Sequence, residues 1–199
     1  MKPEIIFRKI RKQPLNLEGQ RAIARSILVQ ATGKNLEHSH TGRPIVDNSM
    51  DVSISHREDM VCVGIVPKPY RIGIDVESID VELNPELFFG PVITKAEQTC
   101  LKTFCENNNL SLASGVAIFW SIKEAFFKCL DYDLKPGKVN IISIARDGRA
   151  IINCEDEIKQ FMVDRRLKFH SAKTSFFDKK LSFNKVIMKE GVGGSYPPN

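Results

Sequence analysis

The chain has 199 residues, of which 42% are hydrophobic, and it carries a formal net charge of +5. This length and hydrophobic content exclude a disordered chain, and no apolar run approaches the roughly 20 residues of a membrane span, so we expect a compact cytoplasmic protein without membrane contact. The modest positive charge is compatible with an anionic ligand or an acidic partner, and solvated surface charge explains it equally well.

Periodic patterns of apolar residues predict the first elements. Residues 17–30 place apolar side chains at helical spacing and end before Gly33, so a helix is expected there. The alternation of residues 51–56 predicts a half-buried strand, and the continuous β-branched run of residues 60–66 predicts a strand buried on both faces. Residues 72–77 follow as a third strand after a proline-containing turn.

The rest of the chain is helical first and strand-like afterwards. Helices are expected at residues 87–91, 94–105 and 112–130, with Thr94 and Glu97 forming a capping box. Strand-like patterns follow at residues 139–145, 150–153, 167–171 and 181–188. This mixed order predicts an α+β fold, followed by a flexible tail rich in Gly and Pro over residues 191–199.

A pair of carboxylates marks the third predicted strand. Asp75 and Glu77 are two residues apart, so both side chains project from the same face, with Cα atoms about 6–7 Å apart. Two carboxylates this close are able to share one metal ion, and a few hard oxygen ligands suit Mg²⁺ better than Zn²⁺. Such a pair at a strand end also commonly faces solvent without any function.

A second candidate lies on the predicted helix 112–130. Trp120, Glu124 and Lys128 follow one another at intervals of four residues and occupy one stripe of that helix, which aims a carboxylate and an ammonium group in the same direction. An ordinary surface Glu–Lys pair has the same spacing, but the apolar neighbours of the stripe favour partial burial.

Two shorter motifs supply candidate phosphate contacts. Ser55 and His56 stand at the end of a predicted strand, where a hydroxyl and an imidazole are both able to donate to a phosphate. Gly42-Arg43-Pro44 predicts a rigid turn that presents Arg43. Neither motif establishes a function by itself.

The order of these motifs is more informative than any one of them. It runs Gly42-Arg43-Pro44, Ser55-His56, Gly73-Ile74-Asp75-Val76-Glu77 and Trp120-Ser121-Ile122-Lys123-Glu124-Ala125, with Lys128 four residues after Glu124. This ordered set resembles the 4′-phosphopantetheinyl transferases of the surfactin and enterobactin type, over a span from about residue 21 to about residue 188. Enzymes of that family move the phosphopantetheine arm of coenzyme A to a serine of a carrier protein and release adenosine 3′,5′-bisphosphate.

The resemblance implies a fold of two similar halves about a pseudo-twofold axis, with coenzyme A in the cleft between them. Residues 1–73 would form the N-terminal half, which binds coenzyme A, and residues 74–190 the C-terminal half, which carries the metal site and the catalytic helix. Because one chain supplies both halves, we expect a monomer.

The resemblance also implies a role for each site residue. Asp75, Glu77 and Glu124 would hold Mg²⁺ at the pyrophosphate of coenzyme A. Glu124, directly or through a metal-bound water, would take the proton of the carrier serine, and Lys128, the other catalytic residue, would contact the pyrophosphate.

The expected coenzyme A contacts comprise Ser55 and His56 at the phosphates, Arg43 at the adenosine end, Arg21 and Arg25 near the 3′-phosphate, and Lys123 and Lys128. Three positions depart from the family pattern. Ser53 replaces an asparagine common in the surfactin type, Arg57 follows His56 where a small residue is usual, and Arg43 replaces a frequent lysine. These departures bear on the cofactor contacts and the subclass, and leave the metal ligands unchanged.

The partner implied by the resemblance is an apo acyl or peptidyl carrier protein, in a setting such as secondary metabolite biosynthesis, and nucleic acid is not expected as a partner. The residues do not separate fatty-acid, polyketide, siderophore and peptide-synthetase carriers.

Two alternatives stay open from the residues alone. A Mg²⁺-dependent nuclease would also use paired carboxylates, a Glu–Lys pair and a basic chain, and a catalytically silent homologue would bind carriers or coenzyme A without turnover.

Overall fold

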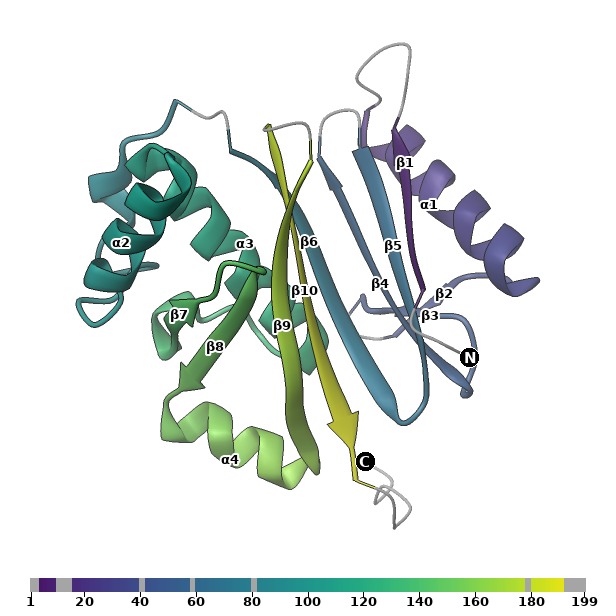
Figure 1. The fold of residues 1–199 in the computed structure, drawn as a ribbon. Coiled ribbons are helices and arrows are strands. Elements are labelled where there is room, and N and C mark those ends of the chain that lie inside the picture. Colours follow the sequence, from purple (N-terminus) through teal and green to yellow (C-terminus); the bar gives the residue numbers. More distant parts are fainter. Residues whose placement is uncertain are drawn as a thin grey trace.

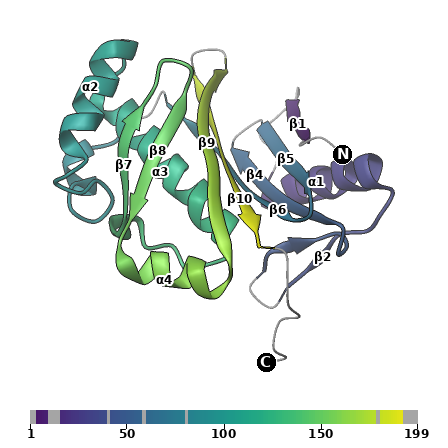
Figure 2. The same ribbon diagram turned by 60° about the horizontal axis from the view of Figure 1, so that its bottom comes forward.

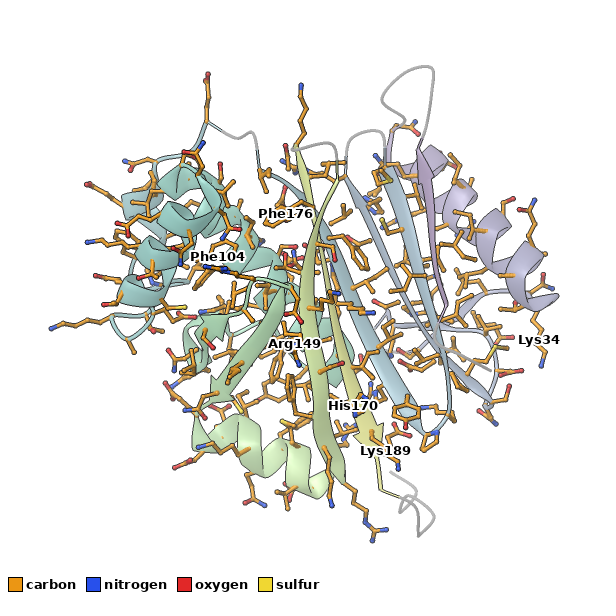
Figure 3. The ribbon with its side chains drawn as sticks, viewed as in Figure 1. Lys34, Phe104, Arg149, His170, Phe176 and Lys189 are labelled. Carbon is orange, nitrogen blue, oxygen red and sulfur yellow. The ribbon has the colours of Figure 1, made fainter. Side chains whose placement is uncertain are left out.

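The computed structural model describes residues 4–9, 16–39, 42–57, 60–79, 82–177 and 180–191, and the structural statements below concern this part of the chain. Its two larger sheets are antiparallel, meet along one seam and are each covered by helices (Figure 1). Lys34, just beyond the first helix, and Phe104, on the second, mark opposite sides of the molecule (Figure 3).

The first sheet has three strands in the order β1-β5-β4, formed by β1 (Glu4–Lys9), β4 (Met50–Arg57) and β5 (Met60–Pro67). Helix α1 (Leu17–Thr32) covers one face of it, where Ile27 and Leu28 are buried against strand residues such as Val63 (Figures 1 and 2). The Asn16 side chain caps the start of α1, and Gly33 ends it in the left-handed conformation that glycine adopts without strain. The short strands β2 (Glu37–His38) and β3 (Pro44–Ile45) form a separate ribbon.

The second sheet has five strands in the order β6-β10-β9-β8-β7. These are β6 (Tyr70–Ser78), β7 (Val139–Ile144), β8 (Arg149–Cys154), β9 (Leu167–Phe177) and β10 (Leu181–Glu190). Helix α3 (Leu112–Leu130) packs on one face, supported by α2 (Gln98–Asn108), while α4 (Asp156–Asp164) lies at the end of the sheet (Figures 1 and 2). Short 3₁₀ turns occupy Pro85–Phe88 and Pro136–Lys138.

The seam between the sheets is made by side chains instead of a backbone ladder. Strand β6 pairs with β10 on one edge, and its other edge faces β4. There the Ile72 amide donates to Asp51 Oδ2 (2.8 Å), the Ile74 amide to Ser53 Oγ (3.1 Å) and the Val76 amide to Ser55 Oγ (3.1 Å). Alternate polar side chains of β4 therefore satisfy the buried amides of an edge strand, which fixes the register of the two sheets.

The predicted α+β class agrees with this architecture, and the main helices and strands lie where the sequence patterns place them. The two-halved arrangement about a twofold axis stays a prediction. The boundary placed between residues 73 and 74 falls inside β6, because the chain changes from one sheet to the other at the turn of residues 68–69 instead. Most of the predicted tail lies outside the described residues, at 192–199.

Several element predictions need correction. Helix α2 begins at Gln98 instead of residue 94, and the expected helix 87–91 is only the short turn Pro85–Phe88. Strand β1 and helix α4 had no clear periodic signal. No single helix in the described ranges has the length and apolar character to cross a membrane; only α2 and α3 taken together, bent by 117°, meet that criterion.

Candidate active site

The site is created where α3 touches the backbone of β6. At Gly73, an added Cβ would lie 1.8 Å from the Ala125 carbonyl oxygen and 2.4 Å from the Cys129 amide nitrogen. No side chain fits in that space, so glycine allows the helix to rest directly on the strand. This contact brings Glu124 and Lys128, on α3, beside Asp75, which is two residues beyond Gly73 on β6.

Asp75 is 4% exposed, and three side chains donate to its carboxylate. Oδ1 accepts hydrogen bonds from Ser55 Oγ (2.9 Å) and Lys128 Nζ (2.5 Å), and Oδ2 accepts one from Ser121 Oγ (2.6 Å). The donors come from β4 and from two positions on α3 that are seven residues, or about two turns, apart. Asp75 is therefore held at the junction of both sheets and the helix.

Glu124 and Lys128 complete the charged cluster. Lys128 Nζ lies 3.2 Å from Glu124 Oε2 as well as close to Asp75. Burial, followed by the negative charge of Asp75, raises the pKa of Glu124. Burial acts to lower the pKa of Lys128, but Asp75 and Glu124 outweigh it and the pKa is raised. Two carboxylates share one ammonium group, so the cluster has one uncompensated negative charge when all three are ionised.

Glu77 is paired with a different cation, Arg57. Its Oε1 accepts from the Ser78 amide (2.9 Å) and pairs with Arg57 Nε at 2.9 Å. Within the described ranges, no group of three or more His, Cys, Asp or Glu side chains is arranged to hold a metal ion. Arg57 is paired with one oxygen of Glu77, and the shared metal-binding role of Asp75, Glu77 and Glu124 stays a prediction.

The predicted phosphate contacts on β4 divide between two faces. Ser55 is buried, and its hydroxyl donates to Asp75 and accepts from the Val76 amide. It therefore positions the carboxylate instead of facing a ligand. His56 is half-buried, and burial, then the charges of Lys128 and Arg21, lower its pKa. Arg21 is exposed on α1 within electrostatic range of His56, and Arg25 is exposed one turn farther along.

Arg43 lines the cleft and also makes hydrogen bonds to several elements of the fold. Its guanidinium donates to Asp51 Oδ2 (2.6 Å), to the Ile72 carbonyl (3.2 Å) and to the carbonyl of Lys128. These bonds join β3, β4, β6 and the end of α3. Because the guanidinium is engaged in these bonds, only the part of Arg43 that lines the cleft remains for the expected contact with adenosine, which stays a prediction.

Lys123 is not at the site. It is fully buried, and its ammonium group donates to Glu97 Oε2 (2.7 Å) and to the carbonyls of Val92 (2.5 Å) and Pro136 (3.0 Å). A lysine ammonium has three hydrogens, so no donor remains for a ligand. The predicted coenzyme A contact of Lys123 is corrected to a structural role in the core.

A cleft of about 420 Å³ opens next to the charged cluster. One wall is β3 and β4, and the other is the end of α3 with the loop that follows it. Its lining residues are Gly42, Arg43, Pro44, Val52, Ser53, Ile54, Glu124, Phe127, Lys128, Asp131, Tyr132, Asp133 and Leu134. The lining is mixed in polarity, because it includes the charged residues Arg43, Glu124 and Lys128 as well as apolar residues such as Val52 and Phe127.

The sequence analysis missed part of this surface. The loop of residues 131–134 carries no motif, and it reaches the cleft because Asp131 ends α3 with φ 59° and turns the chain back. The sequence analysis named Ser121 within a motif and Arg57 as a departure from the family pattern, but it did not predict their contacts. Their partners, Asp75 and Glu77, lie far away in sequence.

Comparison with protein-family models gives one match, which covers the last two of the four motifs. Residues 71–176 match the family model described as ACPS, the 4′-phosphopantetheinyl transferase superfamily. The solved structures that match include the crystal structure of the holo-ACP-synthase from Plasmodium yoelii, at 16% identity and a TM-score of 0.47, covering 62% of this chain and 100% of that one. No curated protein sequence matches the chain significantly.

Proposed function

This chain belongs to the 4′-phosphopantetheinyl transferase superfamily, and we propose that it transfers the 4′-phosphopantetheine arm of coenzyme A to a serine of an apo carrier protein in a Mg²⁺-dependent reaction. One observation carries the proposal: Asp75, Glu124 and Lys128, from distant parts of the chain, converge at the edge of a cleft of about 420 Å³. Phosphoryl transfer depends chiefly on positioning and charge stabilisation, and such a cluster supports both.

The charge balance of the cluster fits a divalent cation. Two carboxylates, which supply hard oxygen ligands, share a single ammonium group, and burial, followed by the charge of Asp75, raises the pKa of Glu124. Asp75 and Glu124 would hold Mg²⁺, joined by Glu77 when Arg57 releases it. Mg²⁺ bound there would neutralise negative charge on the pyrophosphate of coenzyme A.

The cations around the cleft would bind the phosphates of coenzyme A. Lys128 is 36% exposed along its side chain and lines the cleft, so its ammonium group is available to the pyrophosphate. His56 and Arg21 lie close enough together for their charges to interact, and we assign them to the 3′-phosphate, with Arg25 adding charge nearby. The exposed part of Arg43 borders the adenosine end.

Glu124 would accept the proton of the carrier serine. Its carboxylate is half-buried and lines the cleft, and its raised pKa makes it a stronger base than an ordinary glutamate. The serine oxygen then bonds to the β-phosphorus of coenzyme A as the bond to the bridging oxygen breaks. Adenosine 3′,5′-bisphosphate leaves with that oxygen, and the carrier keeps the arm.

A panel of apo acyl and peptidyl carriers, incubated with coenzyme A and Mg²⁺ and analysed by intact-protein mass spectrometry, tests the function. Each accepted carrier should gain about 340 Da, and chelation of Mg²⁺ should abolish the gain. A preference for peptidyl carriers would support the surfactin and enterobactin subclass.

Absence of transfer to every carrier in the panel would refute the proposal. Binding of a carrier or coenzyme A without turnover would then favour a silent homologue, and Mg²⁺-dependent nicking of plasmid DNA would favour a nuclease. Gel filtration of the same preparation tests the expected monomer.

A further inference from the structure

A row of buried polar side chains runs behind Asp75, away from the cleft. On β10, Asn184 is paired directly with Asp75 of β6 on one side and with Thr174 of β9 on the other. All three residues are at most 4% exposed, and they share the face of the sheet on which α3 packs. Ser121 of α3 lies above this row and is fully buried.

The hydrogen bonds of the row have a direction. Asn184 Nδ2 donates to Ser121 Oγ (2.8 Å), and Ser121 Oγ donates to Asp75 Oδ2 (2.6 Å). A serine hydroxyl has one hydrogen, and the amide of Asn184 can only donate to the oxygen that it meets there. The Ser121 hydrogen is therefore directed to Asp75, and the amide of Asn184 sets that direction.

Asn184 is costly to keep in this position. Its Nδ2 also reaches Ser182 Oγ (3.3 Å), but its Oδ1 has no hydrogen-bond partner among the described residues and is buried. A buried acceptor without a donor destabilises the folded state, and an apolar side chain of similar shape would remove that cost. Asn184 thus donates a hydrogen bond to Ser121 while its own carbonyl oxygen accepts none among the described residues.

We propose that Ser121 and Asn184 are positioning residues for Asp75: they hold Oδ2 from behind, so that Oδ1 stays turned toward Lys128 at the edge of the cleft. This inference rests on the proposed function of Asp75 as a ligand of the divalent cation. Side chains that orient a metal ligand in this way typically account for about 10–100-fold in metal affinity or activity.

The test compares Ser121→Ala and Asn184→Leu with the unmodified chain. Mn²⁺, whose unbound form is counted by electron paramagnetic resonance, is titrated into each protein with and without coenzyme A. We expect Ser121→Ala to weaken Mn²⁺ binding by about 10–100-fold. Asn184→Leu should cause a smaller loss while its melting temperature stays equal or rises, a combination that a purely structural role does not produce.

Thr174→Val is the matched control. Thr174 lies in the same row, and its buried Oγ1 has no partner among the described residues, so the change removes a hydroxyl that holds nothing. Its Mn²⁺ affinity should equal that of the unmodified chain. In turnover assays, Ser121→Ala should lower kcat more than it changes the KM for coenzyme A, since Lys128 and His56 are untouched.

The outcomes separate the two proposals. Unchanged Mn²⁺ affinity in Ser121→Ala, or an equal loss in Thr174→Val, would overturn the positioning role and leave the transfer reaction standing. Weakened Mn²⁺ binding in a chain that transfers no arm to any carrier would refute the transfer and support the positioning role. If Ser121→Ala fails to fold, Asn184→Leu decides. An unmodified chain that binds no Mn²⁺ overturns the positioning role.

Discussion

Two lysines on one helix show how differently the same ion pair can be used. Lys123 and Lys128 both lie on α3, and both contact carboxylates. The side chains of Lys123 and Glu97 are completely buried, with one positive charge facing one negative charge. Lys128 is partly exposed and faces two carboxylates, Asp75 and Glu124.

The two lysines differ in how completely their hydrogen bonds and charges are satisfied as well as in burial. Every donor of Lys123 is occupied, and Glu97 also accepts from the amides of Thr94 (2.9 Å) and Ile141 (2.7 Å). The cluster of Lys128 keeps an excess negative charge and opens to a cleft. A closed network has nothing left to bind, while an unbalanced one favours a cationic ligand.

The largest expected effect is on the buried pair of Lys123 and Glu97. Lys123→Met should lower the free energy of unfolding by about 3–5 kcal/mol, because it leaves the charge of Glu97 buried and unpaired. Chemical denaturation measures this. Lys138→Met is the control, since Lys138 pairs with Glu155 at 2.7 Å on the surface and should cost less than about 1 kcal/mol. Equal losses would remove the distinction, and adding Glu97→Gln to Lys123→Met should restore part of the stability.

The next largest effect is expected from removing the carboxylate of Asp75 from its cluster with Glu124 and Lys128. Asp75→Asn keeps the side-chain volume but removes the charge, and transfer to a carrier should fall by more than about 100-fold, beyond the usual effect of supporting residues alone. The rate of mass gain measures this, while circular dichroism should show an intact fold. Asp147→Asn, at an exposed turn, is the control. Retained turnover in Asp75→Asn would contradict the role of Asp75.

In Glu124→Gln, stability and activity should move in opposite directions. The raised pKa of Glu124 means that the folded protein holds this proton more tightly than the unfolded chain, whose value is near 4.5, so ionisation destabilises the fold as the pH rises above that value. At pH 7 the variant without metal should melt higher by about 2–4 °C for each kcal/mol relieved, and the gain should disappear near pH 4. A lower melting temperature at pH 7, or full turnover, would contradict the imbalance.

The smallest effect concerns the pair Arg57 and Glu77 at the rim of the site. Its side chains are 44% and 19% exposed, so Arg57→Ala should change stability by less than about 1 kcal/mol. If Arg57 competes with the metal for Glu77, the variant should reach half-maximal activity at a lower Mg²⁺ concentration. A Mg²⁺ titration measures this, with Arg149→Ala as a surface control. A higher Mg²⁺ requirement would show that Arg57 does not compete with the metal.

Local patterns predicted much of the fold because each depends on residues that are close in sequence. The strand at residues 60–66 and the helix at 112–130 were predicted nearly to their ends, since β-branched runs and helical periodicity reflect burial of whole faces. Half of the predicted capping box is present, because Glu97 accepts from the Thr94 amide, but the Thr94 hydroxyl donates to Asn140 Oδ1 instead. The start of α2 was misplaced because residues 95–97 form a turn before the helix begins at Gln98.

The sequence by itself singled out Asp75, Glu77, Glu124 and Lys128 as candidate site residues, from their spacing and from the order of the motifs. Only the tertiary structure decided how they are used. It closed Lys123 into the core, paired Glu77 with Arg57, and placed Ser121 and Asn184 behind Asp75. Periodicity fixes the face from which a side chain projects, whereas its partners come from strands and helices that are distant in sequence and meet only in the folded chain. Asp75 and Lys128, for example, meet where Gly73 lets α3 rest on β6.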